Sequence, residues 1–152
     1  MKKTLLILVA IVFAVTACNK QTYVDGTYSV KYDAIDSHGW QAFVEFTLVE
    51  DAITEASYDY YDANMNLKSE DTAYQSRMSG IVGIGPADYT PMINANIKAA
   101  TILPQFDSID VVTGATHSCH TANELVKAGL DAAMDGEPTV IELVQPDPMV
   151  EE

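Results

Sequence analysis

The nine residues Asp-Val-Val-Thr-Gly-Ala-Thr-His-Ser, from Asp110 to Ser118, are the stretch around which the rest of the chain can be interpreted. Residues 109–112 form a short strand-like run, which predicts the end of a strand. Residues 113–116 are all small and predict a tight turn. A helical pattern begins directly afterwards, so the stretch predicts a strand, a short loop and the N-terminus of a helix.

The segment after this loop carries apolar or small residues at three- and four-residue spacing, which is typical of an amphipathic helix. Thr116 or Ser118 is suited to cap the N-terminus of this helix, and Gly136 is suited to end it. The face predicted to be buried comprises Ala122, Leu125, Val126, Gly129, Leu130, Ala133 and Met134.

The loop also has the composition of an anion-binding site. A helix N-terminus presents free backbone N–H groups and the positive end of the helix dipole. Gly114 lets the backbone approach a ligand closely, and Ala115 adds little bulk. Thr113, Thr116 and Ser118 place three hydroxyls around one point. Taken by itself, the same composition is also typical of a capped helix that follows a turn.

The pattern Asp-x-x-[Ser/Thr]-Gly-Ala-Thr-x-[Ser/Thr] resembles the flavinylation motif of FMN-binding domains. These domains occur in the flavin-carrying subunits of ion-pumping NADH–quinone oxidoreductases and in extracellular electron-transfer lipoproteins. In that family a separate Mg²⁺-dependent flavin transferase attaches FMN, taken from FAD, to the last Thr of the Gly-Ala-Thr triplet. The resemblance implies that Thr116 carries FMN through a phosphoester bond. The remaining motif positions are present without a departure, as Asp110, Thr113, Gly114, Ala115 and Ser118.

The N-terminus predicts export and a lipid anchor. Lys2 and Lys3 precede an apolar run over residues 5–15 that is too short to span a bilayer. The run ends in Ala17-Cys18, which resembles a bacterial lipobox and predicts a signal peptide over residues 1–17. Cys18 would then be the lipidated first residue of an extracytoplasmic protein anchored to the cell membrane. Ordinary secretory cleavage would instead leave a free thiol at Cys18.

The remaining boundaries follow from this reading. Residues 18–24 are expected to form the lipidated start and a short tether. Residues 25–137 correspond to the FMN-binding domain that the resemblance implies, and its opening Gly-Thr-Tyr at residues 26–28 is also similar to that family. Residues 138–152 are expected to form a last strand and an acidic tail.

The charge of the chain limits its partners. The sequence has 8 Lys and Arg against 22 Asp and Glu, a net charge of −14. Removal of the signal takes away two lysines and no acid, which leaves 6 basic residues and a net charge of −16. Such a protein repels nucleic acid and anionic lipid head groups, and we expect its encounters with basic partners to depend on salt.

Two cysteines are present, and lipidation of Cys18 would leave Cys119 as the only thiol, so no intrachain disulfide is expected. Cys119 falls in the first turn of the predicted helix, where it is either a thiol activated by the dipole or a small packed residue. His117, Cys119 and His120 do not predict a metal site, because their side chains diverge around a helix. The Cys-x-x-Cys-His pattern of covalent haem is not found in the sequence.

The rest of the chain predicts a single small α+β domain, an antiparallel sheet with two or three helices packed on it. Strands are expected at residues 27–32, 41–49, 53–61 and 139–144, and helices at residues 73–79 and 88–103. In the second strand Ala42, Val44, Phe46 and Leu48 face one way. Residues 80–86 form a glycine-spaced connector that lacks the Lys-[Ser/Thr] of a phosphate-binding P-loop.

A flavin also needs an apolar slot for its ring, with aromatic partners. The spacing does not choose among the six candidate rings, which are Trp40, Tyr58, Tyr60, Tyr61, Tyr74 and Tyr89. His38 and Trp40 lie at the junction of a loop and a strand, which favours them slightly. Tyr74 and Met78 are four residues apart on a predicted helix and would form one wall.

Together these features predict a lipid-anchored flavoprotein that relays electrons between a quinone- or NADH-linked membrane donor and an external acceptor. It would be the substrate of a flavin transferase, not an enzyme with a substrate of its own. The alternative is an exported lipoprotein that binds a phosphate-bearing ligand noncovalently at the same loop. A purely structural or adhesive surface lipoprotein is a third possibility.

Overall fold

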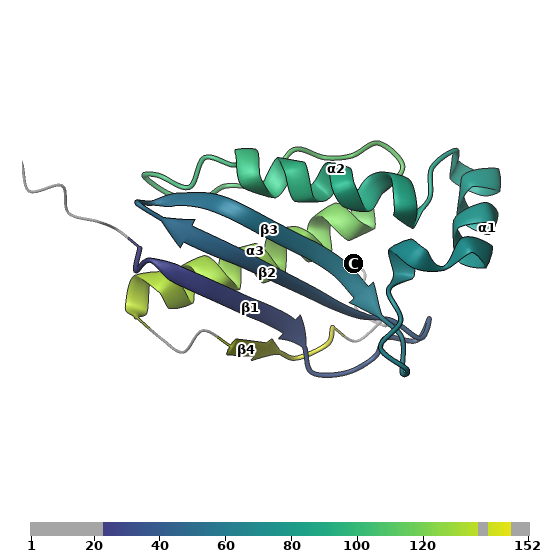
Figure 1. Cartoon of the computed structure of the whole chain (residues 1–152), viewed down its shortest axis with the longest axis horizontal. Coiled ribbons are helices and arrows are strands. Elements are labelled where there is room, and N and C mark those ends of the chain that lie inside the picture. Colours follow the sequence, from purple (N-terminus) through teal and green to yellow (C-terminus); the bar gives the residue numbers. More distant parts are fainter. Residues whose placement is uncertain (1–22, 137–139, 147–152) are drawn as a thin grey trace, which may run out of the picture.

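A computed structural model describes residues 23–136 and 140–146 and shows a four-stranded sheet with a long helix across one face (Figure 1). The order of the strands is β3-β2-β1-β4, and β4 runs parallel to β1 while the other pairs are antiparallel. The α+β class is confirmed, and the sheet is mixed instead of purely antiparallel. The elements are β1 (Gly26–Tyr32), β2 (Gln41–Val49), β3 (Ala52–Tyr61), the 3₁₀ turn η1 (Lys68–Glu70), α1 (Thr72–Val82), α2 (Pro86–Ala99), α3 (Thr116–Asp135) and β4 (Val140–Leu143).

The hairpin of β2 and β3 forms where alternation predicted it. Ala42, Val44, Phe46 and Leu48 are all buried, and Glu45 on the other face is exposed. Successive side chains of a strand point to opposite faces, so this pattern buries one face only. The two-residue turn at Glu50 and Asp51 has positive φ at both positions, the backbone that a tight hairpin favours. A β-bulge at Thr47/Leu48 shifts the register of β3.

The helix α3 covers the buried face of the sheet. Six of the seven residues predicted to face the core are buried, from Ala122 to Ala133. Met134 is 48% exposed because it lies at the margin of the stripe in the last turn, so its predicted burial was wrong. Gly136 ends the helix with φ of 69°, as predicted.

Two helix boundaries differ from the prediction. The helix α1 continues through Val82, so much of the predicted connector at 80–86 is helical, and the chain turns only at Gly83, whose φ is 81°. The helix α2 begins at Pro86 and ends at Ala99, not over 88–103. Pro86 suits the first helical position because it lacks an N–H, and the Asp88 carboxylate accepts a hydrogen bond from Gly85 N at 3.0 Å.

The strand predicted over residues 109–112 is not formed. Ile109 N donates to the side chain of Asn123 at 2.8 Å, and the carbonyl of Asp110 accepts from the side chain of Asn96 at 2.8 Å. Side-chain amides therefore satisfy backbone groups that a neighbouring strand would otherwise pair. The segment is held by two helices instead of by a sheet.

The folded part begins before the predicted boundary at residue 25. Tyr23 is 3% exposed, its hydroxyl donates to the carbonyl of Ile102 at 3.0 Å, and its N–H donates to Asp51 at 2.8 Å. At the other end, β4 pairs with β1, so the predicted last strand belongs to the same sheet. The predicted signal peptide, Cys18 and the end of the acidic tail lie outside the described residues.

Candidate functional site

The predicted motif forms a turn that leads into α3. Ala115 N donates to the carbonyl of Val112 at 3.0 Å, which closes the turn. Gly114 has φ of 85°, a left-handed value that favours glycine. Thr116 is the first residue of α3, and its side chain is exposed, as is that of Thr113. Two of the three hydroxyls in the motif therefore face solvent.

The N-terminus of α3 has no side-chain cap. Ala115 occupies the N-cap position, and Cys119 N makes the first intrahelical bond, to the carbonyl of Ala115 at 3.0 Å. The prediction that Thr116 or Ser118 caps the helix was wrong, because both residues lie inside the helix, after the N-cap position. The N–H groups of Thr116, His117 and Ser118 precede that first bond, at the positive end of a 20-residue helix.

Gly114 also brings the motif against the connector between α1 and α2. A Cβ built at Gly114 would lie 2.6 Å from Ile84 Cγ2 and 3.6 Å from the carbonyl oxygen of Val82. Real Cβ atoms do not approach other carbons this closely, so the loop can lie here only with glycine. The end of α1 and the motif are therefore neighbours.

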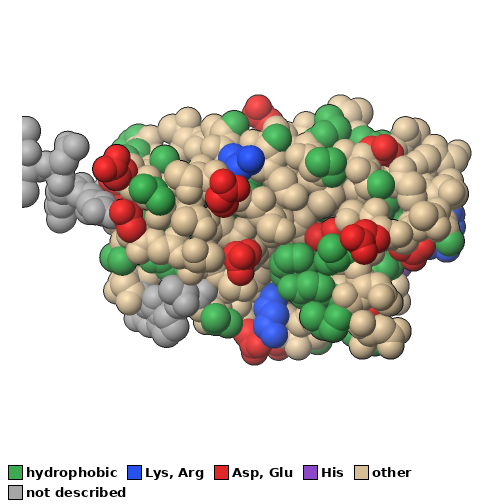
Figure 2. Space-filling view, in the orientation of Figure 1, with side chains coloured by type: hydrophobic (Ala, Val, Ile, Leu, Met, Phe, Trp, Pro, Cys, Tyr) green, Lys and Arg blue, Asp and Glu red, His purple; other side chains and the backbone are tan. Residues whose placement is uncertain are grey.

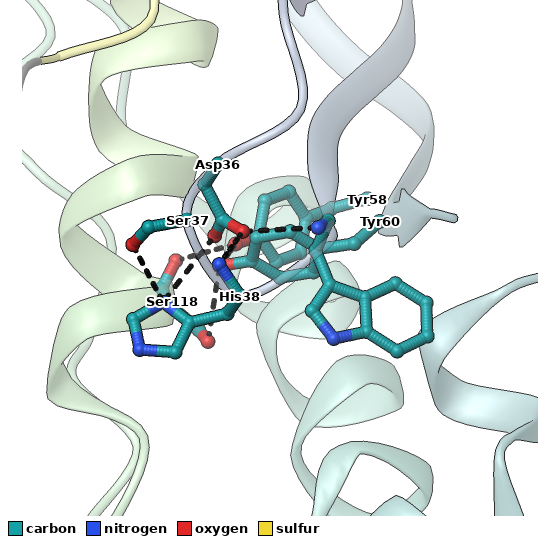
Figure 3. Close-up of polar contacts among 7 residues, drawn as sticks. Asp36, Ser37, His38, Tyr58, Tyr60 and Ser118 are labelled. Atoms are coloured by element: carbon teal, nitrogen blue, oxygen red, sulfur yellow. Dashed lines mark hydrogen bonds and ion pairs between the residues drawn. The ribbon is translucent and has the colours of Figure 1, made fainter. Parts of the chain in front are cut away.

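Ser118 faces the core and not the solvent-exposed side of the loop (Figure 3). The hydroxyl of Tyr58 donates to the carbonyl of Ser118 at 2.9 Å, and the hydroxyl of Tyr60 lies 3.2 Å from Ser118 Oγ. The two tyrosine oxygens are themselves 2.6 Å apart, and burial raises the pKa of both groups. This buried network joins the first turn of α3 to β3, so Ser118 supports the motif from the core side.

Trp40 and Tyr74, two of the candidate rings, contact one another. Their ring centres are 5.8 Å apart in an edge-to-face arrangement. The rings surround the Lys68 ammonium, which lies 5.5 Å from the Trp40 ring centre and 4.8 Å from the Tyr74 ring centre. Tyr60 adds a third ring at 4.2 Å. Lys68 stands between the strand predicted at residues 53–61 and the helix predicted at residues 73–79, and no pattern in the sequence pointed to it.

Burial governs the charge of Lys68. The side chain is 7% exposed, and desolvation lowers its pKa to about 8. The negative charges of Asp36 and Asp59 act in the other direction and raise this pKa. The three ring faces attract a cation and also oppose the shift. The ammonium is thus held by aromatic rings, and no carboxylate lies within 4.0 Å of it in the part of the chain that the structure describes.

The other predicted flavin contacts are scattered. His38 is exposed, with its ring 3.5 Å from Ser37 Oγ and 4.0 Å from the Asp36 carboxylate. The same carboxylate accepts the backbone N–H groups of His38 and Trp40, which orders this loop. Met78 is half-buried on α1. Tyr61 stacks on Phe43 on the opposite face of the sheet, with ring centres 4.1 Å apart.

Cys119 is a packed residue. The side chain is fully buried, and its sulfur accepts a hydrogen bond from Val112 N at 3.3 Å. His117 and His120 are exposed on the helix surface. Within residues 23–136 and 140–146, no three His, Cys, Asp or Glu side chains converge as a metal site requires.

Comparisons with known proteins give a relative and a solved fold. No family model matches the sequence. The 15 kDa lipoprotein of Treponema pallidum (strain Nichols) is 32% identical over 126 residues, which cover 82% of this chain and 86% of the relative. The crystal structure of the CPE2226 protein from Clostridium perfringens has the same fold, with a TM-score of 0.74 and 31% identity over 82% of this chain and 99% of that one.

The relative bears on the predicted anchor. Its name supports the prediction that this chain is a membrane-anchored lipoprotein. No helix among the described residues is both long and apolar enough to cross a bilayer. On the identity and coverage of the match, this chain belongs to the family of the 15 kDa lipoprotein of Treponema pallidum.

Proposed function

We propose that this chain is a lipid-anchored extracytoplasmic flavoprotein that carries FMN covalently on Thr116 and relays electrons between a membrane donor and an external acceptor. The observation that carries the proposal is the position of Thr116. Its hydroxyl is exposed in the first turn of a 20-residue helix that no side chain caps, within a complete flavinylation-like motif. In this role the chain is a carrier and the substrate of a separate flavin transferase.

The residues around Thr116 fit a phosphoester. The first N–H groups of α3 point toward the loop, where the oxygens of a phosphate accept hydrogen bonds favourably. Gly114 keeps the loop against Ile84, and Ala115 is buried beneath it, so no large side chain of the motif stands over the hydroxyl. When bound, FMN supplies reversible one- and two-electron transfer at its isoalloxazine ring.

Apolar surface next to the motif is available to such a ring. Ile81 and Val82 at the end of α1 are 73% and 46% exposed, and Val111 before the turn is 62% exposed. Large aliphatic side chains left in water beside a ligand loop are typical of a binding surface. The contacts predicted at His38, Trp40, Tyr74 and Met78 stay a prediction.

The start of the described chain and the candidate site lie at opposite ends of α3 (Figure 1). Val24 N donates to the carbonyl of Ala133 at 2.9 Å, so the chain enters at the C-terminal end of this helix. At about 1.5 Å per residue, Thr116 lies about 26 Å away along the axis. The five steps along the chain from Cys18 to Tyr23 span at most about 18 Å. This arrangement supports an acceptor that docks from outside, at the Thr116 end.

A pair of substitutions tests the covalent bond. Thr116→Ala removes an exposed hydroxyl, and the matched control Thr113→Ala removes another from the same loop. Both variants should keep the fold because neither side chain is packed. Co-expressed with a flavin transferase, the wild-type chain and Thr113→Ala should give a fluorescent band on a denaturing gel, and Thr116→Ala should give none. An equally labelled Thr116→Ala variant would refute the assignment.

The same gel distinguishes covalent attachment of FMN from the alternative function, noncovalent binding. A phosphate-bearing ligand held noncovalently by the α3 N-terminus would be released on denaturation and would leave no labelled band for any variant. Recovery of a flavin or another phosphate compound in the supernatant of the denatured native protein would favour that alternative.

A further inference from the structure

An open hollow lies on the other side of the sheet from α3. It has a volume of about 300 Å³ and is lined by residues of β2, β3, η1 and α2. Figure 2, which shows the open face of the sheet, has a hydrophobic patch on this face with both acidic and basic side chains beside it. The volume is at the lower end of the range for small-molecule sites. The hollow contains no residue of the motif.

Thr90 gives this hollow an unsatisfied polar group. The residue lies on α2, lines the hollow and is 6% exposed. Its hydroxyl oxygen is buried and has no hydrogen-bond partner among the described residues. Buried hydroxyls are almost always bonded because leaving one unpaired is unfavourable. Because this oxygen is covered, a donor atom of a ligand in the hollow would complete its bonding after a rotation of the Thr90 side chain about χ1.

Asp59 places a carboxyl group at the same hollow. It is 4% exposed and faces away from Tyr58 and Tyr60, its neighbours on β3. One carboxyl oxygen accepts Tyr60 N at 2.7 Å and Ser69 N at 3.4 Å, yet burial raises the pKa of the group. No cationic side chain lies within 4.0 Å of it in the described part of the chain. The charge of Lys68 acts on this carboxyl group only from a greater distance, so a ligand cation would supply a partner in direct contact.

An apolar wall completes the hollow. Phe43, held parallel to Tyr61 at 4.1 Å between ring centres, lines one side, and Leu67 and Pro91 line another. A ligand with an apolar body and a single polar end matches these surroundings. The net charge of −16 expected for the mature chain attracts cations and repels anions, which favours a cationic end.

We propose that this hollow binds a small organic amine, with its apolar body against Phe43 and Leu67 and its ammonium donating to the Asp59 carboxylate and the Thr90 hydroxyl. An ammonium has only donors, and both of these groups accept. The site is independent of the flavin proposal, since it shares no residue with the motif.

Binding can be measured by NMR titration of the full mature chain with 2-phenylethylamine. We expect saturable amide shifts at Phe43, Thr90 and Asn94, which all line the hollow. The matched anion 3-phenylpropionate should cause none. Asp59→Asn should weaken binding by about tenfold or more, because a charge-assisted bond is lost. Glu55→Gln, which removes an exposed charge from the same strand, should leave the affinity unchanged.

Thr90→Val keeps the shape of the side chain and removes only the unpaired hydroxyl, so it should fold and bind the amine several-fold more weakly. This variant decides the matter if Asp59→Asn does not fold. Absence of saturation at amine concentrations on the order of 10 mM would overturn the proposal. Equal binding of the acid and the amine would overturn it as well, as would unchanged affinity in Thr90→Val.

Discussion

Gly129 lies where α3 packs tightly against the sheet. A Cβ built there would be 2.6 Å from both Cε1 and Cζ of Phe46 and 3.1 Å from Cγ2 of Val30. Both neighbours are fully buried in the core, so neither side chain has free space into which to move. Only a hydrogen atom fits between the helix and the strands at this position.

The expected effect of Gly129→Ala follows from two opposing contributions. Overpacking a tight core costs about 1–3 kcal/mol. Replacing glycine by alanine inside a helix returns about 1 kcal/mol. Gly80→Ala is the matched control, since Gly80 is also within a helix but has nothing within 4 Å of its built Cβ. The propensity gain is the same at both positions, so the control isolates the packing cost.

Urea denaturation of the wild type and both variants measures this difference directly. We expect Gly80→Ala to raise the free energy of unfolding slightly. The free energy of unfolding of Gly129→Ala should be lower than that of Gly80→Ala by about 1–3 kcal/mol. If the two variants are equally stabilised, α3 does not approach the sheet as closely as the structure places it, and the packing argument for the whole helix is wrong.

Three further changes test the parts that support the motif. Tyr58→Phe removes the hydroxyl that donates to the Ser118 carbonyl and should lower the free energy of unfolding by about 1–2 kcal/mol in urea denaturation; no loss would mean that this network is not formed. Asn94→Ala removes the amide that bonds both Tyr58 N and Tyr58 O at the edge of β3, so hydrogen exchange at the Tyr58 amide should become faster, and unchanged protection would contradict that role. Because the pKa of Lys68 is about 8 in the folded chain and 10.5 otherwise, the unfolded chain binds more protons between these values, and the free energy of unfolding should rise from pH 8 toward pH 10. The rise should be absent in Lys68→Met, and an equal rise in that variant would assign it to another group.

The sequence correctly predicted the elements whose burial follows a regular pattern of apolar residues. The alternation of β2 marks one buried face, and the spacing along α3 marks the stripe that packs on the sheet. Gly136 ended the helix as predicted because a left-handed residue there favours glycine. Such features depend on neighbours close in the sequence, so a sequence pattern can reveal them.

Features that depend on distant partners were missed. Residues 109–112 have the composition of a strand, but their backbone groups are bonded by Asn96 and Asn123 from two helices. Lys68 has no apolar pattern around it, yet three rings from separate segments enclose its ammonium. The parallel pairing of β4 with β1 likewise depends on where α3 returns the chain. None of these partners is adjacent in the sequence.

The motif contains both kinds of feature, those set by nearby residues and those set by distant partners. Gly114 lies in the turn and Thr116 at the start of α3, where the pattern of small residues followed by a helical repeat predicted a turn and a helix N-terminus. Ser118 does not present its hydroxyl to the same point, since Tyr60 contacts it from the core side. The pattern of small residues therefore indicated the turn, while the direction of each hydroxyl depended on the packing of β3.

Intact mass spectrometry of the native mature protein tests the central claim most directly. The chain would be extracted from the membrane of a cell that has the flavin transferase, and the modified peptide would then be sequenced. The account predicts a lipidated Cys18 and one FMN joined through its phosphate to Thr116. A colourless protein with an unmodified Thr116 would contradict it.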